Sequence, residues 1–261
     1  MKESSKAVIR KDIKSIVYDK NILYGMIIAP LIIMILLPAA LLFAAKYAPD
    51  TINGVNIMRK HLTIMKNLSD SQFIIETGIN YMFPILFILI PIMASSMIAG
   101  SSFVVEKEKK TLETLLYTPI DLKELFSAKV IGVFIPSYAV SIITFIAFLL
   151  VTDIEGWALF GKIMLPNVRW GILLLWLTPV VLLFGIFFMV MVSAKAKSFQ
   201  EAQQMCGFIV MPVLFLIVGQ AFGVIIINNI AMIVSGIVIF AADFFLIKSA
   251  ARKFVPEKLM K

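Results

Sequence analysis

The chain contains one cysteine and one histidine in 261 residues, Cys206 and His61. A single cysteine excludes an intrachain disulfide, and we expect Cys206 to be a small apolar filler in a helix. A single histidine excludes a His-Glu-x-x-His zinc helix. Because His61 lies in a polar stretch that we expect to be a loop, it cannot form a Ser/His or Cys/His catalytic pair within the apolar segments.

Charge is scarce in six long stretches of the sequence. Only 15% of the chain is charged and 61% is hydrophobic, whereas a soluble domain is about 45–50% apolar. Each stretch approaches the ~20 residues that cross a bilayer as a helix, and none has the ten-residue alternation of a β-barrel strand. The sequence therefore predicts an all-α integral membrane protein, a single transmembrane domain over residues 1–261. The predicted spans are residues 22–45, 82–104, 130–152, 170–193, 205–227 and 230–247.

Basic residues are concentrated in the short segments between these spans. If the N-terminus is cytoplasmic, the inside segments carry 18 of the 24 lysines and arginines. This positive-inside bias predicts that both termini are cytoplasmic in a multi-pass protein of the cell membrane. The net charge of +8 is thus explained by topology, and we expect no nucleic-acid partner.

Residues 6–20, before the first span, have apolar side chains at helical spacing with lysine and arginine on the other face. This pattern predicts an amphipathic helix in the membrane interface. The alternative is a basic tail that only sets topology.

Two connections on the outside differ strongly in length. Residues 46–81 form the longest predicted outside loop, which is polar and too short for an independent domain. Asn228 and Asn229 alone separate the last two predicted spans. They are either a tight turn or a break between half-helices that re-enter the membrane.

The segment from Gly156 to Ile163 has the spacing of a phosphate-binding loop up to its last position. Such a loop needs serine or threonine after its lysine to reach magnesium, and here Ile163 follows Lys162. We interpret this segment as an interfacial one that carries Trp157. The chain is therefore predicted to have no ATPase site and no catalytic site of its own.

Residues 105–129 form the most informative cytoplasmic segment. Charges are dense at its start, three leucines then follow at helical spacing, and Thr118-Pro119 breaks the helix. Asp121 is placed to cap a second short helix, with Glu124 three residues later as in a capping box. We predict a helix-turn-helix elbow at the membrane surface; a solvated loop is the alternative.

This segment resembles the cytoplasmic elbow of type 2 ABC-transporter permeases, which export drugs, sodium, polysaccharides and similar cargo. Two weaker resemblances, in residues 10–31 and 248–259, extend the similarity over most of the chain. The elbow's matching residues are Glu106, Glu108, Thr111, Glu113, Leu115, Leu116 and Pro119, followed by Glu124, Leu125 and Lys129.

The resemblance implies a fold and a set of partners. Members of the family have six spans per subunit, two permease subunits pair as a homodimer or heterodimer, and each docks a separate ATPase subunit. ATP and magnesium would bind to that partner, and this chain would hold no cofactor. The elbow would act as the coupling helix, with the turn 195–203 as a second, minor contact. The ATPase-contact residues carried over are Glu106, Glu108, Thr111, Glu113, Leu116 and Pro119.

Polar side chains inside the spans are candidates for lining a translocation path. Asp243 is the one acidic residue within a predicted span, and its role is either structural, near the headgroups and paired, or in transport. Serine hydroxyls also bond to their own helix, which gives them a second explanation. The candidates are Ser95, Ser137, Ser141, Gln220 and Asp243.

The leading hypothesis is the permease subunit of an ATP-driven ABC exporter, in which export as the direction rests on the resemblance. One alternative is an ATP-independent secondary transporter or channel, which would usually show an internal repeat and more midplane charge. Another is a membrane scaffold or signalling subunit. The scarcity of charge in the spans favours amphipathic or lipid-like cargo.

Overall fold

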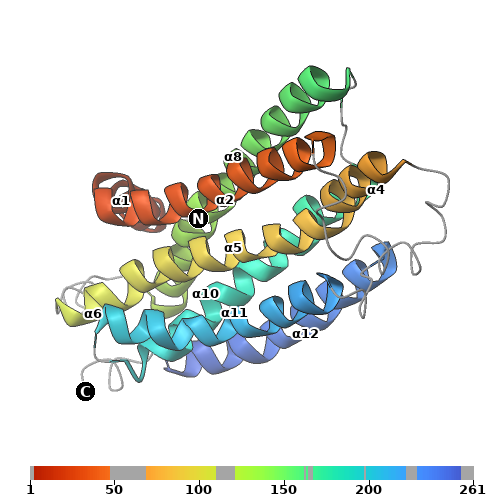
Figure 1. The fold of residues 1–261 in the computed structure, drawn as a ribbon. Coiled ribbons are helices and arrows are strands. Elements are labelled where there is room, and N and C mark those ends of the chain that lie inside the picture. Colours follow the sequence, from red (N-terminus) through yellow and green to blue (C-terminus); the bar gives the residue numbers. More distant parts are fainter. Residues whose placement is uncertain are drawn as a thin grey trace.

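The computed structural model describes residues 3–47, 69–109, 121–161, 163, 167–196, 198–221 and 228–253. These residues are helical almost throughout, and no strand occurs among them. Six of the helices are long and apolar enough to cross a membrane, which confirms the predicted fold class. Figure 1 shows the long helices side by side, with α1 and α6 at one end of the bundle and α4 at the other. We call these the α1 end and the α4 end.

The first two helices are α1 (Glu3–Tyr18) and α2 (Lys20–Tyr47). The second span combines α4 (Asp70–Thr77), η3 (Gly78–Met82), α5 (Phe83–Ala99), η4 (Gly100–Val105) and α6 (Glu106–Glu108). The third is α8 (Leu122–Phe160), and the fourth combines α9 (Val168–Ile172), η5 (Leu173–Leu177) and α10 (Thr178–Ser193). The last two are α11 (Phe199–Ala221) and α12 (Asn229–Lys253). The segments η3, η4 and η5 are π-helical turns.

The helices extend beyond the apolar stretches that marked them in the sequence. The outside loop predicted at 46–81 is wrong for residues 70–81, where Ser69 and Gln72 form a capping box that starts α4. The third span, predicted at 130–152, is part of a helix that runs from Leu122 to Phe160. Hydropathy marks only the part of a helix that lies in hydrocarbon, whereas its ends depend on where the backbone is capped.

The predicted second helix of the elbow is the beginning of α8. Asp121 is at its N-cap with extended backbone, as predicted, but its side chain makes no capping hydrogen bond. The predicted capping box is therefore wrong. Glu124 Oε1 instead accepts a hydrogen bond of 2.5 Å from Ser5 Oγ of α1, so a tertiary contact takes the place of the local one.

The glycines that mimicked a phosphate-binding loop lie at the end of α8. Gly156 is inside the helix, and Gly161 is its C-cap with φ 65°, a left-handed conformation that glycine adopts without strain. The Gly161 N–H bonds to the Trp157 carbonyl at 2.9 Å. Because the helix uses these amides, this described part of the segment forms no phosphate cradle.

The second and fourth spans form the centre of the bundle. In their most apolar stretches 67% and 56% of the residues are buried, against 17% in α11 and α12. Trp170, at the start of the fourth span, is buried between these helices, with its ring centroid 4.6 Å from that of Phe148 and 5.5 Å from that of Phe87. The outward side chains of α11 include Phe208 and Phe215, each 72% exposed. Large apolar groups on the outside suit hydrocarbon rather than water.

A proline follows one of the π-helical turns, and the backbone carbonyls beside it accept hydrogen bonds from other helices. Pro84 follows η3 by two residues, and proline in a helix leaves the carbonyl four residues earlier without its usual N–H partner. That carbonyl belongs to Asn80, and it accepts a hydrogen bond from Arg169 at 3.1 Å. The neighbouring Tyr81 carbonyl accepts from Gln220 at 2.7 Å. The interrupted backbone is thus satisfied by side chains from other helices.

Residues 6–18 of the segment predicted at 6–20 lie in a helix, α1, which packs against α8 and α2, whereas Asp19 is not helical and Lys20 begins α2. Its buried face consists of Ser5, Val8, Asp12 and Ile16, which are spaced three or four residues apart as one helical face requires. The segment is therefore helical, as predicted, and its location in the membrane interface stays a prediction. The face includes a buried carboxylate, and that carboxylate belongs to the site described next.

Candidate functional site

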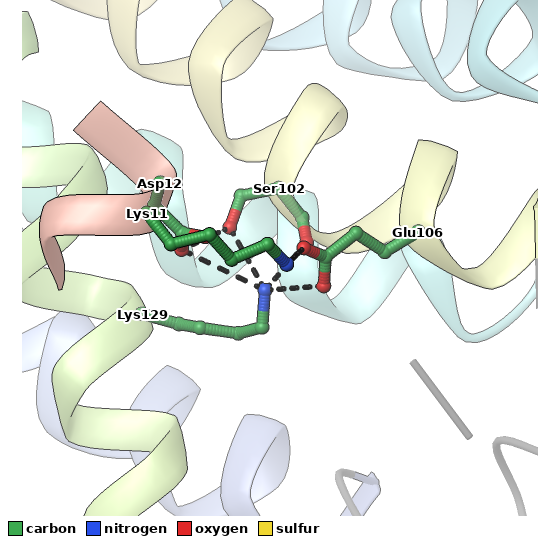
Figure 2. Close-up of polar contacts among 5 residues, drawn as sticks. All are labelled: Lys11, Asp12, Ser102, Glu106 and Lys129. Carbon is green, nitrogen blue, oxygen red and sulfur yellow. Dashed lines mark hydrogen bonds and ion pairs between the residues drawn. The ribbon is translucent and has the colours of Figure 1, made fainter. Parts of the chain in front are cut away.

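Three segments that are distant in the sequence bring charged side chains together at the α1 end of the bundle. Figure 2 shows Lys129 of α8 facing side chains from α1 and from the end of the second span. We call this group the charge cluster. Its members are Lys11, Asp12, Ser102, Glu106 and Lys129.

Lys129 is the centre of the charge cluster and is completely buried. Its Nζ donates to Glu106 Oε2 at 2.6 Å, to the Ser102 carbonyl at 2.9 Å and to Ser102 Oγ at 3.2 Å. It lies 3.7 Å from Asp12 Oδ2 and 5.4 Å from the centroid of the Phe103 ring. A lysine ammonium has three N–H donors, so these neighbours satisfy it and allow its burial.

The two carboxylates are paired in the same way. Glu106 Oε1 lies 2.5 Å from Lys11 Nζ while its other oxygen binds Lys129. Asp12 Oδ2 accepts a hydrogen bond of 3.0 Å from Ser102 Oγ. Two lysines and two carboxylates have no net formal charge, which is what a buried ionic group requires.

Burial raises the pKa of Asp12 above its usual range. The neighbouring Lys129 opposes this shift, the like charge of Glu106 adds to it, and the Ser102 hydrogen bond and Lys11 oppose it. Desolvation therefore outweighs the attraction of the lysines at this carboxylate.

We predict that the effect of Asp12→Asn depends on pH. A folded protein in which a carboxyl group has a raised pKa loses stability as the pH rises from the unfolded-state pKa, about 3.9, through the folded-state pKa. Asparagine resembles the protonated acid and lacks this loss, so the melting temperature of Asp12→Asn should rise relative to wild type over that window. Melting in detergent at several pH values measures the difference. A difference that falls with rising pH would mean that the Lys129 attraction dominates.

The residues after Glu106 contact the end of α10 and the start of α11, on either side of the turn that the sequence predicts as a second ATPase contact. Glu108 Oε2 accepts a hydrogen bond from the Phe199 N–H at 3.2 Å, at the start of α11. Lys107 Nζ donates to the Ser193 carbonyl at 3.1 Å. Gly100 allows this approach, because a Cβ there would lie 2.7 Å from the Phe199 ring. The base of the elbow is therefore held by α1, α8 and α11 together.

The structure describes two of the six predicted ATPase-contact residues. Glu106 is 13% exposed with both oxygens bound to lysines, and Glu108 caps α11. The other four, Thr111, Glu113, Leu116 and Pro119, lie outside the described residues. Sequence reasoning missed Lys11, Asp12 and Ser102 as partners of the elbow. The signal for Asp12 was available, since it falls on the apolar face between Val8 and Ile16.

The candidates for a translocation path are buried but dispersed over four helices. Ser95, Ser137 and Ser141 each donate to a carbonyl three or four residues earlier in their own helix. Asp243 is 3% exposed, and neither of its oxygens has a hydrogen-bond partner among the described residues; the predicted pairing is not seen there. Gln220 donates to the second span. Within the described part of the chain, no hydrogen bond joins Ser95, Gln220 or Asp243 to the serines of α8.

Metal binding has no support in the described part of the chain, where no three histidine, cysteine or acidic side chains are placed to hold an ion. Cys206 is buried, as expected of a filler, with its Sγ 3.6 Å from Met189 Sδ.

Six helices that are long and apolar enough to cross a membrane define a multi-pass membrane protein, with a charge cluster at one end of its bundle. The family model of the ABC-2 type transporter matches residues 3–218, from the first turn of α1 into α11. The chain therefore belongs to the ABC-2 type transporter family and is a membrane permease subunit of an ABC transporter. No match was found among curated proteins or among solved structures.

Proposed function

We propose that the chain is the permease subunit of an ATP-driven exporter, in which a separate ATPase subunit hydrolyses ATP and the elbow passes its movement to the spans. The observation that carries this proposal is the Glu106–Lys129 ion pair of 2.6 Å. The elbow begins at one of these residues and ends at the other, so a buried contact closes its base. Family membership supports the ATPase partner.

The charge cluster supports a route for the movement. A force on the elbow acts through Lys129 on α8 and through Glu106 on the second span, and Lys11 and Asp12 connect both to α1. Buried ion pairs resist separation, because breaking one leaves an uncompensated charge. The three elements therefore move as one unit, and sliding of α8 against the second span at this end is suppressed.

The proposed topology places the α1 end in the cytoplasm of the cell, with both termini there, and the α4 end outside. The positive-inside bias of the sequence supports it. Two such permeases, identical or different, would pair and dock two ATPase subunits. ATP and magnesium would bind to those subunits, and the permease would contribute no catalytic residue.

The test is co-purification of an ATPase subunit with the tagged permease in mild detergent, identified by mass spectrometry. We expect an ATPase subunit with wild type and at least a severalfold loss with Glu113→Lys, because charge reversal on a docking surface weakens association. Glu3→Lys is the matched control: it reverses an exposed glutamate at the same end of the bundle, outside the elbow.

Absence of an ATPase subunit from wild-type preparations would contradict the proposal, and an ATP-independent transporter or a scaffold would then explain the chain better. Equal loss in Glu3→Lys and Glu113→Lys would contradict the assignment of the elbow as the docking element, since a general charge effect would then account for both.

A further inference from the structure

A cavity of about 230 Å³ lies toward the α4 end of the bundle, remote in the fold from the charge cluster. Its walls come from the second span, the fourth span, α11 and α12. The lining is mainly apolar, with polar groups from Asn80, Tyr81, Arg169 and Ser235. Ligand sites in proteins are typically concave and apolar with a few placed polar groups.

Arg169 is the charged group of this cavity, and contacts with three neighbouring residues hold its side chain in place. Its Nε donates to Asn229 Oδ1 at 3.0 Å, and one terminal nitrogen donates to the Asn80 carbonyl at 3.1 Å. The guanidinium carbon lies 3.6 Å from the centroid of the Tyr81 ring, a cation–π contact. Arginine has five N–H donors, and these contacts use two of them.

The positive charge of Arg169 is not neutralised within the described part of the chain. All its hydrogen-bond partners there are neutral, and no described carboxylate lies within ion-pair distance. An indirect connection to an acid runs through Asn80, whose Nδ2 donates to Glu76 Oε1 at 2.7 Å. A partly buried cation without a paired anion, with donors left over, is a binding group for an anion.

The apolar part of the cavity extends away from Arg169 along the helices. The lining residues of the second span run from Asn80 to Ile88, which is ~12 Å at 1.5 Å per helical residue. On α12 they run from Ala231 to Ser235 in the same sense. The cavity is thus cationic at one end and mainly apolar at the other, where the Ser235 hydroxyl bonds to the Met232 carbonyl of its own helix.

We propose that this cavity binds an amphiphile with a single apolar chain and an anionic headgroup, with Arg169 holding the headgroup and the apolar walls holding the chain. A phosphate, carboxylate or sulfate head matches the planar donor arrangement of a guanidinium. The ligand comes either from the surrounding lipid, at the headgroup level of the α4 end, or from free amphiphile that enters the permease.

Radiolabelled dodecyl phosphate tests this on the tagged permease held on beads in dodecyl maltoside. Saturable binding is expected for wild type, displaced by unlabelled dodecyl phosphate and much less by dodecyltrimethylammonium. Arg169→Gln should weaken binding roughly tenfold or more, because it removes a charge-assisted contact. Ser235→Phe, which fills the cavity from α12 and leaves the Arg169 hydrogen bonds intact, should also reduce it.

Lys46→Gln is the matched control. It removes another cation at the α4 end, where Lys46 is exposed and donates to the Leu159 carbonyl, and it should bind dodecyl phosphate as wild type does. Equal displacement by the cationic and anionic detergents, or unchanged binding in both Arg169→Gln and Ser235→Phe, would overturn the proposal.

Native mass spectrometry of the extracted protein separates the two sources. An anionic phospholipid retained by wild type and lost in Arg169→Gln would identify membrane lipid as the ligand. Binding of added dodecyl phosphate without any retained lipid would identify a free amphiphile. Because the experiment uses the permease without an ATPase, its failure would leave the proposed function untouched, and failed ATPase co-purification would leave this site untouched.

Discussion

Replacing Lys129 with methionine should produce the largest loss of stability of any single substitution considered for this protein. Methionine keeps much of the apolar volume but removes the buried cation between Glu106 and Asp12, so Asp12 loses its lysine neighbour and Glu106 keeps only Lys11. Removing one partner of a buried ion pair costs roughly 3–5 kcal/mol. For a chain of this size that corresponds to about 10 °C in melting temperature, measurable by thermal unfolding in detergent.

Lys123→Met is the control for this substitution. Lys123 lies six residues earlier on the same helix and is exposed, so the same change in charge and volume should cost less than about 0.5 kcal/mol there. Adding Asp12→Asn to Lys129→Met should recover part of the loss, since it removes one of the two carboxylates. Equal melting of Lys129→Met and Lys123→Met would show that the charge cluster contributes nothing.

Gly185→Val should produce the second largest loss, through packing rather than charge. Gly185 of α10 faces α5, where a Cβ would overlap Ser95 Oγ and lie 3.3 Å from Ser95 Cβ. Valine is stiff at χ1 in a helix and cannot turn away, so α5 and α10 must separate. Overpacking of this kind costs about 1–3 kcal/mol, or roughly 5 °C in the same unfolding experiment.

Gly207→Val separates this packing effect from the effect of valine in a helix. A Cβ at Gly207 would meet no other atom within 4 Å, and replacing a helical glycine removes a residue of low helix propensity. The melting temperature should therefore stay the same or rise. A similar loss at both positions would mean that the close approach of α5 and α10 is unimportant.

The position of Gly185 shows why such effects escape sequence reasoning. Both glycines lie in predicted spans with apolar residues on either side, and no sequence rule marks Gly185 as the one that contacts another helix. Only the crossing of α5 and α10 makes one position intolerant and the other open. The hydropathy pattern predicts that each segment is a helix, but it does not predict which other helix packs against a given glycine.

Local patterns were sufficient for the six helices, the helix before the first span and the family. Uninterrupted apolar stretches can only be helices in lipid, since the backbone must bond within the segment. The helical face around Val8 and Ile16 follows from the 3.6-residue period. The elbow residues from Glu106 to Pro119 predicted the type 2 permease family, and the family model matches. Their contact with an ATPase stays a prediction.

The tertiary structure alone decided which polar groups meet. Lys11 and Glu106 are 95 positions apart, and Arg169 and Asn80 are 89 apart; no spacing rule connects such pairs. Glu124 matched a local capping box but accepts a hydrogen bond from Ser5 on another helix, and the side chain of Asp121 makes no cap hydrogen bond. The sequence by itself thus determined the helices and their membrane setting, which depend on each residue's own hydropathy and periodicity. The packing of those helices determined the charge cluster and the Arg169 cavity, which depend on contacts that exist only once the chain is folded.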